Sequence, residues 1–167
     1  TMSGTITNDG MLYNKNSGAI TGNIVNTSGT LDNFGTINQG TAIVNSGVMN
    51  IGITGTIEDK TTIQNNEHGM ITNQGVITNN NFIRNTGIFA NNGTITNNQE
   101  LTNSNTFNNY GMIVGQQGKI NNSGTLANQG TINNNGNSAI TNSGAMTNSG
   151  TITNAGRISN SGTLDSS

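Results

Sequence analysis

The chain has 167 residues, of which 29% are hydrophobic and 4% aromatic, with 24 glycines and no proline, cysteine or tryptophan. A conventional globular core of this length needs more apolar side chains, so the chain is either disordered or ordered by repetition. Five basic residues against seven acidic ones give a formal net charge of -2. Because these charges are scattered singly and form no basic patch, we expect no nucleic-acid partner.

The same composition limits catalysis and cofactor binding. Without cysteine there is no disulfide and no thiolate metal site, and the lone histidine, His68, leaves little for metal ligation. A histidine in a polar loop, with no positioned partner, is weak support for general-base chemistry. We therefore expect no enzyme activity, no cofactor and no bound metal. The apolar runs are too short to span a bilayer, so we also expect no membrane insertion.

Isolated aliphatic or aromatic residues recur along the whole sequence. Of the 25 intervals between them, 19 equal six residues; glycine stands two residues before them in 19 of 26 units, and asparagine two residues after in 19. In chain order these central residues are Ile6, Leu12, Ile20, Val25, Leu31, Ile37, Ile43, Met49, Ile57, Ile63, Ile71, Ile77, Ile83, Phe89, Ile95, Leu101, Phe107, Ile113, Ile120, Leu126, Ile132, Ile140, Met146, Ile152, Ile158 and Leu164.

A period of six excludes a helix, whose apolar stripe recurs every three to four residues. It fits very short strands, in which the aliphatic residue points inward and its immediate neighbours point to solvent. Threonine and isoleucine favour strands, and we expect glycine and asparagine, which tolerate positive φ, to turn the corner before the next strand. A chain that turns in this way every six residues has to coil.

Three such units close one coil of 18 to 20 residues. Two-residue insertions near Asn16, Gly52, Glu67 and Asn135 are expected to bulge at corners. The fold class predicted is all-β: a single-stranded parallel β-helix, or β-solenoid, with about three short strands per coil and roughly nine coils. We expect residues 1–167 to form one β-solenoid domain, uncapped at both ends.

The repeat predicts two kinds of inward column. One is an aliphatic core, represented by Ile37, Ile43, Ile63, Ile83, Ile95, Leu101, Ile120, Ile132 and Ile152. The other is a ladder of asparagine side chains, each bonding to its equivalent one coil above and below. The predicted ladder residues are Asn73, Asn79, Asn85, Asn91, Asn97, Asn103, Asn109, Asn128, Asn148 and Asn154.

The repeat continues almost to both ends of the sequence, where strand edges would be free to pair. The candidate assembly ends are Thr5, Ile6, Thr7, Thr163 and Leu164. We therefore expect the main partner to be the chain itself, in an end-to-end homopolymer, with a surface or host ligand as a further partner.

Tracts such as Asn121 to Asn134 and Asn142 to Asn160, which read Asn-x-Gly-Thr-Ile-x-Asn, resemble the β-helical regions of bacterial surface adhesins. Filamentous-haemagglutinin-like exoproteins and autotransporter passengers are the types they resemble most. The resemblance covers nearly the whole chain. It implies a right-handed coil and an extracellular or cell-surface location.

The function expected is a non-enzymatic extracellular structural protein, either a self-assembling fibre subunit or a rigid adhesin stalk. The alternative is an ice-binding or carbohydrate-binding solenoid face. For ice binding, the outward pairs Thr94/Thr96 and Thr151/Thr153 fall on one predicted side, but Met112/Val114 and Thr131/Asn133 interrupt them. A separate apolar stripe of Met11, Tyr13, Val48, Met70, Ile88 and Ala90 on another side would suit a lateral contact.

Overall fold

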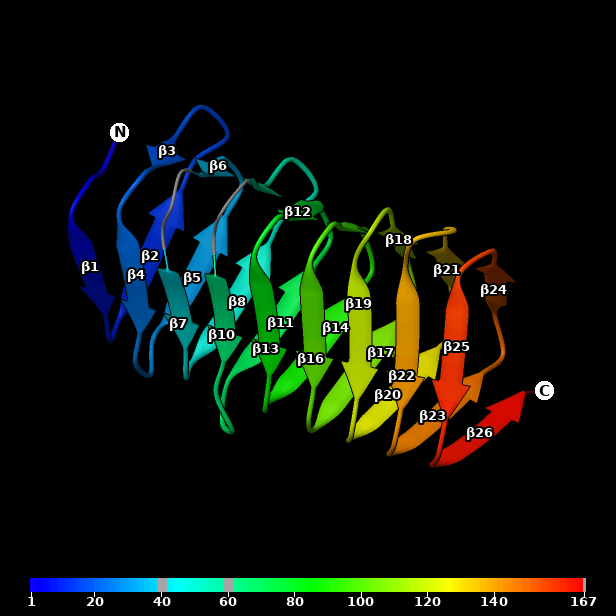
Figure 1. The fold of residues 1–167 in the computed structure, drawn as a ribbon. Coiled ribbons are helices and arrows are strands. Elements are labelled where there is room, and N and C mark those ends of the chain that lie inside the picture. Colours follow the sequence, from blue (N-terminus) through cyan, green and yellow to red (C-terminus); the bar gives the residue numbers. More distant parts are fainter. Residues whose placement is uncertain (39–41, 59–61, 167) are drawn as a thin grey trace.

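A computed structural model describes residues 1–38, 42–58 and 62–166. Its described residues form 26 short strands and no helix, and all strand pairs are parallel (Figure 1). The strands amount to eight complete three-strand turns and two strands of a ninth, close to the roughly nine coils expected. The predicted fold class, an all-β parallel solenoid, is confirmed.

The strands lie in three sheets, each named here by its first strand. The β1 sheet has nine strands, namely β1 (Thr5–Asn8), β4 (Asn23–Asn26), β7 (Ala42–Asn45), β10 (Thr62–Asn65), β13 (Phe82–Asn85), β16 (Glu100–Asn103), β19 (Lys119–Asn122), β22 (Ala139–Asn142) and β25 (Arg157–Asn160). The β2 sheet also has nine, namely β2 (Met11–Asn14), β5 (Thr30–Asn33), β8 (Val48–Ile51), β11 (Met70–Asn73), β14 (Ile88–Asn91), β17 (Thr106–Asn109), β20 (Thr125–Asn128), β23 (Ala145–Asn148) and β26 (Thr163–Ser166). The β3 sheet has eight, namely β3 (Ala19–Ile20), β6 (Thr36–Ile37), β9 (Thr56–Ile57), β12 (Val76–Asn79), β15 (Thr94–Asn97), β18 (Met112–Gly115), β21 (Thr131–Asn134) and β24 (Thr151–Asn154).

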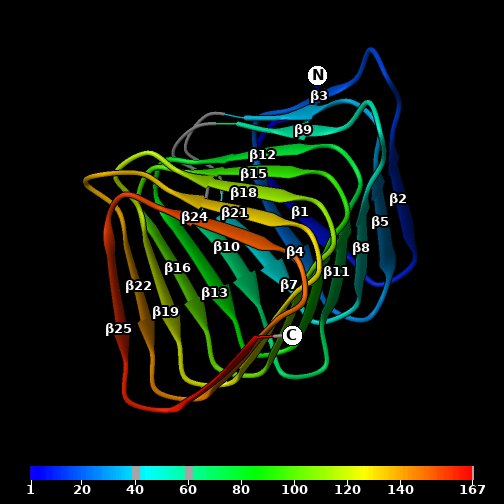
Figure 2. The same ribbon diagram turned by 90° about the vertical axis from the view of Figure 1, so that its right-hand side faces the viewer.

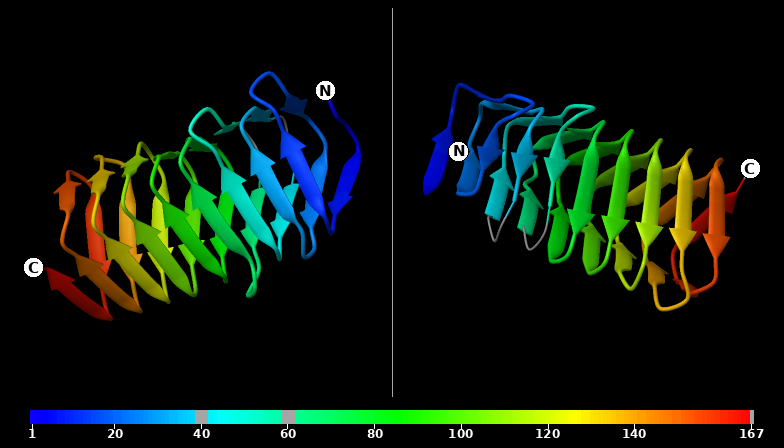
Figure 3. Two further views of the ribbon diagram at one scale, coloured as in Figure 1. Left: turned by 180° about the vertical axis from the view of Figure 1, so that it is seen from behind. Right: turned by 90° about the horizontal axis from the view of Figure 1, so that it is seen from above.

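The coil is right-handed. Viewed from the C-terminal end, the chain passes from β24 through β25 to β26 in a counter-clockwise sense while it advances toward the viewer (Figure 2). Views from behind and from above show the strands of each face side by side in chain order, so the molecule is a short rod (Figure 3). At about 4.8 Å per coil, the rod is roughly 40 Å long.

The register places like residues on like residues along each sheet. For example, Ile77 pairs with Ile95, and Ile95 with Ile113. Burying one apolar face fixes this register, because a slip of one residue would turn every inward side chain to solvent. One sequence assignment is wrong in this respect: Ile24, and not Val25, is the buried central residue, since Ile24 pairs with Ile6 and Ile43.

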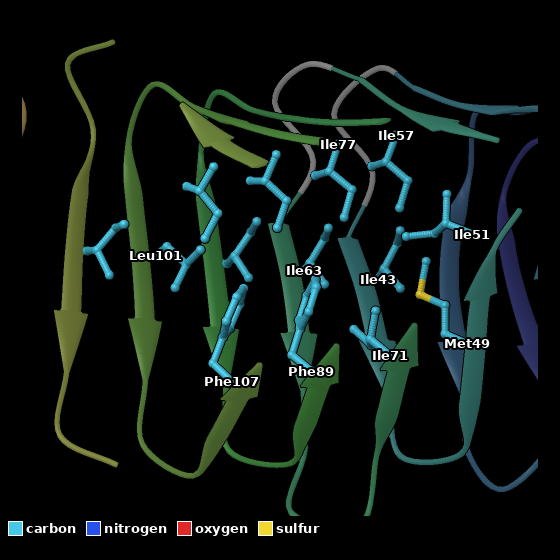
Figure 4. Close-up of a cluster of buried hydrophobic side chains, with 14 of the residues drawn as sticks. Ile43, Met49, Ile51, Ile57, Ile63, Ile71, Ile77, Phe89, Leu101 and Phe107 are labelled. Atoms are coloured by element: carbon cyan, nitrogen blue, oxygen red, sulfur yellow. The ribbon is translucent and has the colours of Figure 1, made fainter. Parts of the chain in front are cut away.

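The core is a single continuous stack of these inward residues (Figure 4). Eight of the nine core residues named from the sequence are buried, and the ninth, Ile152, is partly buried against the same cluster. Phe89 and Phe107 stack with ring centroids 4.8 Å apart and planes 16° from parallel. Their rings repeat along the axis like the aliphatic residues and supply aromatic contact within the core.

The corner glycines are needed for space, which differs from the expectation of positive φ. Among the described glycines, Gly4 alone has a positive φ, of 87°. At Gly111, a Cβ atom would instead meet the carbonyl oxygen of Gly93 in the preceding coil. That oxygen accepts a hydrogen bond from the backbone N–H of Met112 at 2.9 Å, which holds it against Gly111. Close backbone approach, a second common reason for glycine, therefore explains these positions.

The four two-residue insertions form turns at corners, as expected. Each turn is closed by a backbone hydrogen bond across three residues, such as that from Gly69 to the carbonyl oxygen of Asn66 at 2.9 Å. The equivalent bonds join Gly18 to Lys15, Gly55 to Gly52 and Ser138 to Asn135. The extra residues are therefore absorbed at the corners, and the strands on either side keep their register.

Candidate functional site

The most regular chemical feature of the rod is its set of asparagine ladders. In the β1 sheet every strand ends in an inward asparagine, and eight amide–amide hydrogen bonds of 2.7 to 2.9 Å join all nine of them in sequence. The members are Asn8, Asn26, Asn45, Asn65, Asn85, Asn103, Asn122, Asn142 and Asn160. This ladder is unbroken over the full described length of the sheet. The predicted asparagine ladder is confirmed.

The β2 sheet carries a second ladder with one interruption. Asn14 donates to Asn33 at 2.7 Å, and Asn73, Asn91, Asn109, Asn128 and Asn148 form a continuous run. Between the two parts stands Ile51, which pairs with Asn33 and Asn73 and is 1% exposed. Because isoleucine is apolar, it extends the hydrophobic core into the ladder column at this coil.

The β3 sheet carries a third, shorter ladder. Asn79 donates to Asn97, and Asn134 donates to Asn154, both at 2.7 Å. Gly115 stands between the two pairs in register. The side chain of Ser138, which comes from the next corner and is 3% exposed, fills the space that an asparagine at 115 would need.

All ten asparagines predicted as ladder residues take part in these bonds. Ten further members were missed, although they stand at the same offset of two residues after a central apolar residue: Asn8, Asn14, Asn26, Asn33, Asn45, Asn65, Asn122, Asn134, Asn142 and Asn160. Asn26 has this offset from Ile24 and not from Val25, since Ile24 has Gly22 and Asn26 at the repeat spacings on either side. The repeat pattern could have found all ten.

Ladder amides are also bonded to the backbone at the corners, as at Asn85. Asn85 accepts from Asn65 at 2.8 Å and donates to Asn103 at 2.8 Å. Its Nδ2 group also donates to the carbonyl oxygens of Gly87 at 3.1 Å and Thr106 at 2.7 Å. The amide therefore ties three coils together while satisfying its own donors and acceptor in the interior, where an unpaired polar group would be costly.

All fifteen hydrogen bonds between ladder asparagines run in one direction. In each of them the Nδ2 group of the earlier coil donates to the Oδ1 atom of the later coil. Hydrogen bonds aligned in this way polarise one another and strengthen cooperatively. The rod is thus chemically polar along its axis as well as in chain direction.

The outward residues of the β3 sheet lie in the rows that the sequence predicts. Thr94/Thr96 on β15 and Thr151/Thr153 on β24 are separated by Met112/Val114 and Thr131/Asn133. The apolar stripe likewise lies on one face of the β2 sheet, where Met70 pairs with Val48 and Ile88. Polarity changes between adjacent coils in the β3-sheet column, as from Thr94 to Met112, whereas Val48, Met70 and Ile88 are three consecutive apolar residues in the β2-sheet column.

The candidate assembly residues lie on the first and last strands of the β1 and β2 sheets. Thr5 and Thr7 are exposed on β1, and Ile6 between them is partly buried. Thr163 and Leu164 are exposed on β26, where Leu164 retains 47% of its surface. Leu164 pairs with Met146 of the preceding coil and lies in the last described coil of the core column.

His68 occupies the corner turn between β10 and β11, next to Glu67. Within the described part of the chain, no group of three or more histidine, cysteine or acidic residues is arranged to hold a metal ion. The described residues also contain no helix that could cross a membrane.

Comparison with family models, curated proteins and solved structures finds no match for this chain. The fold is that of parallel β-solenoid repeat proteins.

Replacing Asn85 by aspartate tests the ladder directly. The aspartate would lose both N–H donors, which Asn85 directs at three oxygen acceptors, and would place a charge beside the Gly87 and Thr106 carbonyl oxygens. We expect a loss of stability at pH 7 on the order of 3 kcal/mol or more, measured by urea unfolding.

Burial raises the pKa of the introduced carboxyl above its unfolded value of about 3.9. The destabilisation should therefore grow as the pH rises above that value and diminish as the pH falls through it, because the unfolded chain ionises first. Asn108→Asp on the outward face of β17 is the matched control and should change stability little at any pH. Equal losses for the two variants would contradict an inward, bonded Asn85.

The interruption at Gly115 predicts a coupled pair of substitutions. Gly115→Asn alone should destabilise by about 1 to 3 kcal/mol, because its Cβ would lie 2.9 Å from Ser138 Oγ and 3.0 Å from Ser138 Cβ. Ser138→Gly alone should also destabilise, since it empties buried space and adds backbone freedom. Ser138 Oγ has no hydrogen-bond partner among the described residues, so little bonding is lost with it.

The double variant should recover stability by extending the ladder from Asn97 through position 115 to Asn134. A double-mutant cycle from denaturant unfolding should give a favourable coupling of more than about 1 kcal/mol. Additive effects of the two substitutions would mean that Ser138 does not occupy the place of the missing asparagine.

Proposed function

We propose that this chain is a non-enzymatic structural segment: a rigid rod of an extracellular fibre or adhesin-like surface protein. The observation that carries the proposal is the contrast between the inside and the outside of the coil. Inward positions repeat with nearly constant chemistry from coil to coil, whereas outward positions change at almost every coil. A protein that serves as a straight, stiff support needs constant residues only at the inward positions of its coils.

The ladders supply the stiffness. Bending the rod requires adjacent coils to separate on one side, which would lengthen both the backbone bonds of a sheet and the amide bonds behind it. In the β1 sheet there is no coil along the described length at which the amide bonding is interrupted. A rod of this kind holds two attached parts at a fixed distance, which is the function of a stalk.

The outward rows give less support to ice binding. A surface that orders water into a lattice needs matching side chains at regular spacing in two directions. In the β3 sheet, Thr94/Thr96 is followed by Met112/Val114 in the next coil, so the threonine array is interrupted. A structural function requires no such outward regularity.

The common direction of the ladder hydrogen bonds favours head-to-tail stacking of one copy of the rod on another. The coil that contains β1 presents the Oδ1 acceptors of Asn8 and Asn14, and the last strand of the β1 sheet presents the Nδ2 donor of Asn160. A second copy stacked head-to-tail would bring donors to acceptors, whereas head-to-head stacking would bring acceptors together. The partner proposed is therefore another copy of this chain in head-to-tail order.

Deletion of one whole coil tests the rod. Removing residues 83–100, which span the 18-residue interval from Ile83 to Leu101, should leave the remaining coils in register and the protein folded. Spin labels can be placed on Thr7→Cys and Ser159→Cys, because the chain has no native cysteine. Double electron–electron resonance should give one narrow distance distribution, which shortens by about 4.8 Å on deletion. Removing only residues 83–91 should abolish folding, and a broad distribution for the parent chain would contradict a rigid rod.

End-to-end association is tested by charging the last described coil of the core column. The parent chain should form unbranched polymers with an axial repeat of about 4.8 Å by electron microscopy and fibre diffraction. Leu164→Lys should shift them toward monomers in sedimentation experiments, because stacking would bury the ammonium group. Thr147→Lys, which adds the same charge to the flank of β23, should leave polymers unchanged. A parent chain that remains monomeric at all concentrations would contradict self-stacking but leave the rod intact.

A further inference from the structure

A polar groove crosses the outward face of the β1 sheet near the C-terminal end of the rod. It is a hollow of about 500 Å³ lined by Glu100, Lys119, Asn121, Ala139, Thr141, Arg157 and Ser159. These residues come from β16, β19, β22 and β25, which lie side by side in Figure 1. A smaller hollow of about 180 Å³ shares Asn121 and Thr141 and extends toward the corner at Ser123 and Ser143.

The groove arises from side-chain size. In one outward column, Ala139 on β22 stands in register between Lys119 on β19 and Arg157 on β25. In the other, Thr141 stands between Asn121 and Ser159. Ala139 thus forms a floor between two walls made by the longer side chains of Lys119 and Arg157, and the groove continues over the short polar side chains of Thr141 and Ser159. At about 4.8 Å per strand, the wall backbones are about 10 Å apart.

One end of the groove is positively charged. The two cations Lys119 and Arg157 flank the Ala139 methyl group from opposite walls. The Glu100 carboxylate also lines the groove, next to Lys119 in register, and accepts hydrogen bonds from Asn121 Nδ2 and Thr102 Oγ1, both at 3.0 Å. Among the described residues, neither cation has a carboxylate within ion-pair distance. An anion placed over Ala139 would meet a cation on each side.

The other end of the groove offers neutral hydrogen-bonding groups. Ser159 Oγ accepts from Arg157 Nε at 3.0 Å and keeps its own hydroxyl proton to donate. Asn121, which lines the groove, uses its Nδ2 group on Glu100, so its Oδ1 atom is the acceptor that it can offer to a ligand. With the Thr141 hydroxyl on the floor, this end carries both donors and acceptors, the combination that sugar hydroxyl groups require.

We propose that this groove binds a carboxylated sugar residue. The carboxylate would lie over Ala139 between Lys119 and Arg157, and the ring hydroxyls would lie over Thr141 and against Asn121 and Ser159. A neutral sugar would leave the two cations unpaired, and a small inorganic anion would leave the hydroxyl-bearing end unused. The site goes beyond the structural function of the rod, since the rod needs no particular outward residue.

The binding test uses the intact chain labelled with ¹⁵N at low ionic strength, because salt screens exposed charges. Trigalacturonate should shift the amide signals of Ala139 and Thr141 in a saturable way. Maltotriose, which is neutral, and sodium sulfate, which lacks hydroxyl groups on a ring, should each bind at least tenfold more weakly. Absence of saturable shifts with trigalacturonate would overturn the proposal. Sulfate binding of equal strength would also overturn it, by showing a simple anion site.

Two pairs of variants locate the site. Ala139→Leu should fill the floor and weaken trigalacturonate binding at least tenfold, whereas Ala42→Leu, at an outward position of β7 in the same sheet, should have no effect. Arg157→Gln should weaken binding at least fivefold, whereas Arg84→Gln on β13 removes the same charge from the same sheet and should not. Equal losses within either pair would show non-specific attraction and overturn the assignment. Unchanged melting temperatures establish that the variants remain folded, and the coil-deletion experiment tests the rod separately.

Discussion

The structure depends on the inward amide that must be bonded in the interior of each coil. A side chain such as Asn85 has two donated hydrogens and an acceptor to satisfy out of contact with water, and it does so through the coils before and after its own. That requirement fixes the vertical alignment of coils of 18, 19 and 20 residues alike. Extra residues are pushed into corner turns, because a shift within a strand would break the amide bonds as well as the core contacts.

The corner glycines and the ladders are two consequences of the same close stacking. Where one coil lies directly on another, the carbonyl oxygen of Gly93 lies where a side chain at Gly111 would begin. Where an amide is lost, as at Gly115, the neighbouring corner carries a serine that fills the space. The interior is therefore close-packed, and the volume and polarity allowed at each inward position depend on the residue at the same position in the next coil.

The outside of the rod is under different constraints. An outward side chain has contacts mainly with its equivalents one coil away, and most substitutions there leave the interior unchanged. This freedom is consistent with a structural support, and it also allows local sites to arise by variation in side-chain size. The groove over Ala139 is such a case, since a short residue between two long ones is sufficient to form it.

The sequence by itself determined the architecture, because a six-residue period with flanking glycine and asparagine has few ways to bury single aliphatic residues without a helix. It also determined the ladder, since a residue two positions from an inward aliphatic points inward as well. Propensity does not separate Ile24 from Val25, since both are good strand formers, but Gly22 and Asn26 stand at the repeat spacing from Ile24 alone.

Only the tertiary structure decided the rest. Several features depend on residues 18 to 25 positions apart in the sequence. They are the close approach at the corner glycines, the filling of the Gly115 space by Ser138, the common direction of the ladder bonds and the groove on the β1 sheet. Such contacts arise between coils, and they depend on the sizes and orientations of side chains in three dimensions. The repeat pattern records which residues face inward, but it does not record which atoms of one coil meet those of the next.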